Sequence, residues 1–362
     1  ESTLAQIYKR RNPETGESYG GPAYYIEAAL HSRPLAVLFA LSLIATYAGG
    51  FNMLASFNTQ DTFKTFGFYD KTTTPIIIGA ILAVLFAACV LGGGKRLTNI
   101  TGVLVPVMGL LYIIVSLVVV IMNITTLPLV LKSIFVSAFD FKAVFGGFAG
   151  SCMMWGIKRG LYSNEAGMGS APNAAASADV SHPVKQGLVQ MLSVFIDTLL
   201  VCTATAMMCM CANPEGLVAE AAGAVYVQQS IQMALGDFGP IFIAVAMSLF
   251  AFTTLIGNYY YTEGCLQFIL KRNPSKTFML IFRLIATALV FAGALLSAGI
   301  VWDTADMLQG CMVIINVPVI VIIAKPALAA LKDYMSQRKE GKDPVFRSSS
   351  IGLEGKTECW ED

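Results

Sequence analysis

Residues 160–172 read GLYSNEAGMGSAP and follow a hydrophobic segment that runs from Ala143 to Ile157. Glycines, the cationic pair Lys158-Arg159 and the carboxylate of Glu165 therefore stand where a membrane-spanning helix is expected. The interior of a bilayer accepts non-helical backbone and charge only where protein or a water-filled cavity satisfies them. The pattern predicts a spanning helix that is interrupted at a functional site.

The composition of the whole chain supports a membrane location. Of its 362 residues, 56% are hydrophobic and only 13% are charged, whereas a soluble domain carries roughly 25% charged residues. The net charge of +1 gives no electrostatic basis for binding nucleic acid. The sequence predicts an all-α, polytopic helical bundle in the lipid bilayer.

Eight apolar runs have the length of a membrane crossing. They lie at 34–58, 75–92, 97–124, 143–172 (the interrupted one), 187–211, 239–264, 278–300 and 304–324.

Lysine and arginine are concentrated before the first run, after the last run and in alternate loops, whereas the loop 212–238 has none. By the positive-inside rule, the loop 1–33 and the tail 325–362 are expected to be cytoplasmic. They flank a transmembrane domain at 34–324 in the plasma membrane. We expect an external amphipathic helix within 212–238 and a disordered tail beyond Lys342.

The run GLYSNEAGMGSAPNAAASADVSHPVKQG, residues 160–187, closely resembles the signature of the alanine/glycine–cation symporter family, which comprises sodium-coupled amino-acid transporters. The resemblance implies the leucine-transporter fold, in which two inverted five-helix repeats each open with a discontinuous helix. Eight spans would equal the last three helices of one repeat and all five of the next. Together with a first residue that is Glu rather than Met, this count predicts an N-terminally truncated chain that lacks the first core helices.

The resemblance also implies a function. It predicts a secondary active transporter that carries a small neutral amino acid of the alanine/glycine class together with sodium, by alternating access. Sodium would be the coupling ion, and neither an organic cofactor nor another metal is expected. The chain offers no paired carboxylates or activated nucleophile, so it is not expected to be an enzyme. Two alternatives stay open: a membrane enzyme or scaffold without transport, and a transporter of a different amino acid coupled to protons.

The interrupted helix supplies the first substrate candidates. We expect the break between Gly146 and Glu165, where unwound carbonyls could bind an ammonium group and a new helix N-terminus could bind a carboxylate. The alternative is that the glycines only allow close helix packing. The substrate candidates in this segment are Gly150, Ser151, Gly156 and Gly160.

The charged residues of the same helix are gate candidates. Lys158 or Arg159 could pair with Glu165 to form a gate in the cytoplasmic half of the membrane, because unpaired charges there are costly. In the alternative, the long side chains reach the inner interface by snorkelling.

The sixth span supplies candidate ligands for sodium. The carbonyl of Phe250 and the hydroxyls of Thr253 and Thr254 are oxygen donors of the kind that a hard cation prefers. Thr254 and Asn258 are one turn apart and share a helix face. The resemblance implies that residues at these positions face the substrate, so both are substrate-site candidates. The alternative is that the threonines hydrogen-bond to their own helix.

Two asparagines complete the candidates. Asn52 lies in a segment that resembles an amide-rich motif of the family, and it is a further substrate candidate. Asn258 stands where the family frequently has tryptophan, so the resemblance implies a larger substrate pocket in this chain.

Overall fold

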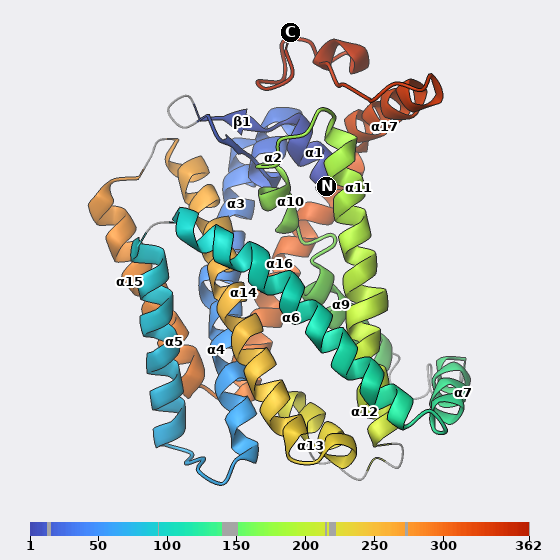
Figure 1. The fold of residues 1–362 in the computed structure, drawn as a ribbon. Helices are drawn as coiled ribbons and strands as arrows, with labels where there is room; N and C mark the ends of the chain where they lie inside the picture. The colour runs from blue at the N-terminus through green and yellow to red at the C-terminus, as the bar shows by residue number, and fades with distance from the viewer. Residues whose placement is uncertain are drawn as a thin grey trace.

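The computed structural model describes residues 1–12, 16–92, 94–139, 151–213, 216, 222–271 and 274–361. The described chain is almost entirely helical, and most of its long helices run between two opposite ends of one bundle (Figure 1). Both termini lie at the same end of this bundle, together with α1, α2 and α17, and we refer to it as the terminal end. The opposite end carries α7 and α13.

The helices of the first half are α1 (Ser2–Ile7), α2 (Pro22–Leu30), α3 (Arg33–Ile44), α4 (Asn52–Asp61), α5 (Thr73–Gly92), α6 (Gly94–Met122) and α7 (Leu127–Ala138). Those of the second half are α9 (Ser151–Asn164), α10 (Ala171–Ala175), α11 (Pro183–Phe195), α12 (Thr203–Ala212), α13 (Gly223–Leu235), α14 (Phe238–Leu270), α15 (Lys276–Leu295), α16 (Ala298–Ile322) and α17 (Ala324–Lys339). π-helical segments join α3 to α4 (η1, Ala45–Phe51) and α11 to α12 (η4, Ile196–Cys202), and short 3₁₀ turns are η2 (Thr62–Thr65) and η5 (Ser348–Ile351). Strands β1 (Arg10–Arg11) and β2 (Ser18–Tyr19) pair antiparallel, with Arg10 opposite Tyr19.

Seven helical segments of the described chain are long and apolar enough to cross a membrane: 33–65, 73–92, 104–122, 183–212, 238–270, 276–295 and 298–322. Each corresponds to one of the eight predicted runs. The remaining run, 143–172, lies partly outside the described residues. Its described part consists of α9, an irregular segment at 165–170 and α10. The chain is therefore a mostly helical membrane protein.

Close helix packing determines the position of α4 within the bundle. Helix α15 lies between α4 and α5 and contacts both. A Cβ atom added to Gly293 of α15 would lie 2.4 Å from the Met53 backbone, so only glycine permits this approach. Small residues at such crossings let two backbones come close and gain dispersion contacts in lipid, where the hydrophobic effect gives no help.

Arg33 fixes the terminal end of α14. Its guanidinium donates to the carbonyls of Phe268 and Ile269 at 2.9 and 3.0 Å and forms an ion pair of 3.0 Å with Glu27. These carbonyls belong to the last turn of α14 and have no partner within the helix. A cation at this position also complements the negative end of the helix dipole.

The loop 212–238 and the tail test two expectations. Helix α13 does form within 212–238, and it buries Ile231 against α12 and α14. The expectation of a disordered tail beyond Lys342 is wrong, because residues 343–361 pack onto the bundle. Phe346 and Trp360 are buried, with ring centroids 5.3 Å apart. Two large aromatic side chains bury enough apolar surface to order a segment that is otherwise polar.

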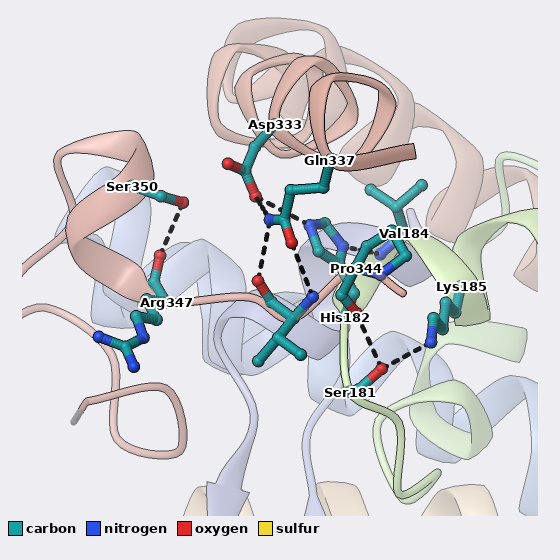
Figure 2. Close-up of polar contacts among 10 residues, drawn as sticks. Ser181, His182, Val184, Lys185, Asp333, Gln337, Pro344, Arg347 and Ser350 are labelled. Carbon is teal, nitrogen blue, oxygen red and sulfur yellow. Dashed lines mark hydrogen bonds and ion pairs between the residues drawn. The ribbon is translucent and has the colours of Figure 1, made fainter. Parts of the chain in front are cut away.

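His182 lies at the centre of the contact between the tail and the bundle (Figure 2). Its Nδ1 accepts the backbone N–H of Val184 at 3.2 Å and so caps α11, while its Nε2 lies 3.2 Å from Asp333 of α17. The imidazole is fully buried. Burial lowers the pKa of His182, and the hydrogen bond to Asp333 opposes this only in part.

Candidate functional site

Within the described part of the predicted run, from residue 151 onward, the helix is interrupted at Glu165. Helix α9 is continuous from Ser151 to Asn164, and Glu165, Gly167 and Gly169 then have φ angles of +57°, +87° and +84°. Left-handed backbone of this kind cannot continue a right-handed helix. Only glycine fits at position 169, because a Cβ atom there would lie 2.8 Å from the ring of Phe39.

The position of the break differs from the prediction in one respect. Gly156 and Gly160 lie within the continuous helix α9, so the expectation that they belong to the unwound segment is wrong. An isolated glycine lowers helix propensity by about 1 kcal/mol, which a long helix tolerates. Gly150 and the side chain of Ser151 lie outside the described residues.

A buried amide of α16 holds the break in place. Asn316 Nδ2 donates to the carbonyl of Gly167 at 3.0 Å, and Asn316 Oδ1 accepts the hydroxyl of Tyr25 at 2.7 Å. Both side chains are fully buried. The non-helical carbonyl of Gly167 is thus satisfied by protein, as backbone at membrane depth requires.

The charged residues of α9 pair differently from the prediction. Lys158 Nζ lies 3.2 Å from Asp306 Oδ2, Arg159 pairs with the other oxygen of the same carboxylate, and the Arg159 guanidinium lies 4.2 Å from the ring centroid of Trp302. The expected pairing with Glu165 is wrong, because Glu165 instead accepts the hydroxyl of Ser170 at 2.7 Å.

The location of this ion pair follows from its place in α16. Asp306 is about 12 Å along α16 at a rise of 1.5 Å per residue, and α16 runs from the far end of the bundle toward α17 (Figure 1). The pair therefore lies in the half farther from the two termini. The side chain of Asp306 is 13% exposed, so two cations neutralise a carboxylate that is largely shielded from water.

A cavity of about 440 Å³ lies where the segment after the break meets α14. Ala174 and Ser177 line it from one side, and Thr253 and Thr254 line it from the other. The remaining lining residues are Val105, Ile256, Gly257, Tyr260 and Tyr261. Its size suits a small solute, and the hydroxyls of Ser177, Thr253 and Thr254 add polar groups to a mostly apolar lining.

The two threonines differ in their hydrogen bonding. The Thr253 hydroxyl donates to the carbonyls of Phe250 at 2.9 Å and Leu249 at 3.1 Å, so the back-bonding that we considered does occur at this residue. A hydroxyl that donates backward still presents the lone pairs of its oxygen to a cation. Thr254 is exposed to the cavity.

Asn52 and Asn258 contact each other directly. Asn258 Nδ2 donates to Asn52 Oδ1 at 2.9 Å, and both amides are buried between α4 and α14. Asn258 is not among the residues that line the cavity beside Thr254. Thr254 and Asn258, which the sequence predicts to share one helix face, thus lie in different surroundings.

Sequence reasoning missed Asp306 and Asn316. Asp306 is not among the candidates named from the sequence, although a carboxylate inside an apolar run is a recognisable signal of function. Asn316 had the same signal, a polar side chain in a run of Val and Ile. Neither position reveals its partner, because the partners lie more than 100 residues away in the chain.

The fold and this site define a polytopic membrane protein with a broken helix and, between helices, a mostly apolar cavity that carries a few hydroxyl groups. The sodium:alanine symporter family model matches residues 1–348. The chain belongs to this family, whose members are membrane transporters for amino acids rather than enzymes.

Three relatives from Bacillus subtilis illustrate the range of the family. The amino-acid carrier protein AlsT is 43% identical, over 100% of this chain and 75% of its own length. A putative sodium/proton-dependent alanine carrier, YrbD, is 41% identical over 100% of this chain and 76% of its own. The probable sodium/glutamine symporter GlnT is 40% identical over 99% of this chain and 73% of its own.

Proposed function

We propose that this protein is a secondary active transporter that moves a small neutral amino acid with sodium by alternating access. The observation that carries the proposal is the cavity between the segment after the helix break and the threonine turn of α14. It combines exposed hydroxyls with non-helical backbone nearby, which is how transporters build sites for zwitterions and cations inside the membrane.

The proposed architecture is the leucine-transporter fold. The broken helix α9–α10 would open one inverted repeat, and α11 to α16 would complete it. With the terminal end cytoplasmic, residues 1–33 and the tail 325–362 face the inside of the plasma membrane, and α13 faces the outside. The distribution of lysine and arginine supports this orientation.

The sodium ligands that we propose are the hydroxyls of Thr253 and Thr254 and the carbonyl of Phe250. They are oxygen donors on one turn of α14, and Ser177 also contributes to the lining of the same cavity. Sodium, like calcium, is a hard cation that is bound by several such oxygens.

For the substrate we propose the broken segment, Thr254 and the amide pair Asn52–Asn258. The amide pair lies between α4 and α14 and would contribute to the substrate site indirectly. Each asparagine already uses part of its hydrogen-bonding capacity on the other. Asparagine at 258 in place of a larger ring favours substrates beyond alanine, and the glutamine relative supports testing this range. The residues Gly150 and Ser151 stay candidates on the sequence alone.

The ion pair of Lys158 and Arg159 with Asp306 is the proposed gate. Its position in the half away from the termini makes it an external gate in the orientation above, rather than the cytoplasmic gate suggested by the sequence. Glu165 would act at the break through Ser170 instead.

Uptake of labelled alanine into proteoliposomes, with and without an inward sodium gradient, tests the proposal. Replacing Thr253 and Thr254 together with valine removes two hydroxyls at nearly constant volume. We expect the sodium concentration for half-maximal uptake to rise by about tenfold or more, equivalent to about 1.4 kcal/mol. Thr287→Val is the matched control, because Thr287 also donates to its own helix, at 2.8 Å to Arg283, on α15. Equal sodium activation in all three proteins would refute the assignment.

Coupling to protons is the second candidate, favoured by the printed description of YrbD as sodium/proton-dependent. Uptake measured with an imposed proton gradient and without sodium distinguishes proton coupling from sodium coupling. Uptake driven by protons alone, and unchanged in the double valine variant, would assign the coupling to protons. Competition by unlabelled alanine, glycine, serine and glutamine then ranks the substrates.

A further inference from the structure

The C-terminal segment 343–361 contacts the first helix through Trp360. The indole Nε1 of Trp360 donates to the carbonyl of Gln6 at 2.7 Å, and the Nζ of Lys9 lies 4.7 Å from the centroid of the indole ring. Trp360, Gln6 and Lys9 are each less than 10% exposed. The last residues of the described chain are thus part of the packed interior at the terminal end.

Gln6 and Lys9 in turn hold the segment that follows the helix break. Gln6 Nε2 donates to the carbonyls of Ala175 at 2.6 Å and Ala178 at 2.9 Å, and Lys9 Nζ donates to Ala178 at 3.2 Å. These carbonyls belong to the end of α10 and the turn after it, where intrahelical partners run out. Two side chains beside the tail therefore cap α10.

The capped segment forms one wall of the candidate site. Ala174 and Ser177, which line the cavity together with the threonine turn of α14, are neighbours of Ala175 and Ala178 in the chain. A single layer of side chains, Gln6 and Lys9, separates Trp360 from this wall.

The tail is attached at a second place, beside the start of α11 (Figure 2). Phe346 N–H donates to the carbonyl of Ser181 at 2.9 Å, and the Ser181 hydroxyl donates to the carbonyl of Pro344 at 2.9 Å. Lys185 pairs with Asp343 at 2.6 Å. The tail thus spans from α11 to α1, and both of these helices contact α10.

We propose that residues 343–361 form a positioning strap: through Trp360 and Gln6 they hold α10 in place and restrict access to the cavity from the terminal end. Movement of α10 away from α14 would require Gln6 and Lys9 to follow or to release its carbonyls. The strap, docked on both α1 and α11, opposes that movement. The consequence for transport rests on the proposed function, whereas the restriction of access does not.

Access is measured directly with a cysteine at Ser177. In the full-length protein, with the exposed Cys202 and Cys311 and the partly exposed Cys89 and Cys359 replaced by serine, the rate at which Ser177→Cys reacts with a polar maleimide reports access to the cavity. We expect Trp360→Ala to raise this rate by about threefold or more, as expected when a closed state loses a stabilising contact. Trp360→Phe keeps the ring but loses the N–H donor, and it should give an intermediate rate. Glu354→Ala is the matched control, because Glu354 is an exposed residue of the same tail.

Transport kinetics provide the second measurement. In proteoliposomes, Trp360→Ala should change the maximal rate of alanine uptake more than the KM, because the strap touches none of the cavity residues. The melting temperature of every variant is recorded, so that a variant that fails to fold is replaced by Trp360→Phe. Unchanged labelling in both tryptophan variants that fold would overturn the proposal. If Trp360→Ala is labelled faster but the wild-type protein transports no amino acid, the proposal that the strap restricts access stands and the proposed function is refuted.

Discussion

The amide of Asn258 donates a hydrogen bond of 2.9 Å to the amide of Asn52, across 206 residues of sequence and between two membrane-spanning segments. Both side chains are at most 4% exposed. In such a setting each amide depends on the other, because neither can turn to water for a replacement partner.

The pair should behave as a unit in mutagenesis. Asn258→Leu leaves the Asn52 oxygen buried without its donor, and we expect a loss of about 1–3 kcal/mol in the free energy of unfolding. Asn52→Leu should cost a similar amount. The double variant should lose less than the sum of the two, with a coupling of about 0.5–3 kcal/mol in a double-mutant cycle. Strictly additive losses would show that the two amides do not interact.

Asp306 should be indispensable for transport because it neutralises two cations. Asp306→Asn leaves Lys158 and Arg159 without their carboxylate, and we expect at least about a tenfold drop in uptake, equivalent to about 1.4 kcal/mol. Asp303→Asn is the control, since Asp303 is an exposed carboxylate on the same helix. Similar uptake by the two variants would exclude the ion pair from the gate.

Glycine is required at 169 and not at 156. Gly169→Ala combines a left-handed backbone, which costs an L-residue about 1–2 kcal/mol, with a methyl group less than 3 Å from Phe39 and Pro22. We expect a clear drop in melting temperature. Gly156→Ala lies in the helix α9 with no described atom within 4 Å of the new methyl group, and it should be neutral or raise stability. A destabilised Gly156→Ala protein together with an unaffected Gly169→Ala protein would place the break elsewhere.

His182 should make the stability of the protein depend on pH. Its pKa is lowered in the folded state by burial, so between the folded pKa and the ordinary value of 6.5 the unfolded chain binds more protons. Stability is therefore complete above about pH 6.5 and falls as the pH drops below it. Protonation of Nδ1 would also remove the acceptor that caps α11.

The measurement compares melting temperatures at pH 7.5 and 5.5 in the wild type and in His182→Asn. Asparagine keeps an N-cap acceptor but does not titrate. The wild type should lose more stability on acidification than the variant. Equal losses in the two proteins would show that His182 does not cause the pH dependence of stability.

Several features of the fold could be predicted from the sequence because they depend on neighbours in the chain. The length and apolarity of seven runs correspond to spanning helices, and the concentration of glycine and polar residues after Asn164 indicated a broken helix. The residue at which the break begins could not be predicted. Glycines at 156 and 160 resemble those at 167 and 169 in sequence. Only the tertiary structure distinguishes them, because Gly167 and Gly169 have left-handed backbone and Gly169 packs closely against Phe39, Pro22 and Asn316.

The sequence by itself determined that this is a helical membrane protein of the sodium:alanine symporter family, since hydrophobicity, charge asymmetry and a contiguous motif are properties of the chain. Only the tertiary structure decided which polar groups meet. Lys158 and Arg159 pair with Asp306 rather than with Glu165, which is nearer in the sequence. The polar tail is ordered by the packing of Phe346 against Trp360. The physical reason is that a buried charge or amide must find its partner in space, and helix packing brings together groups far apart in the sequence.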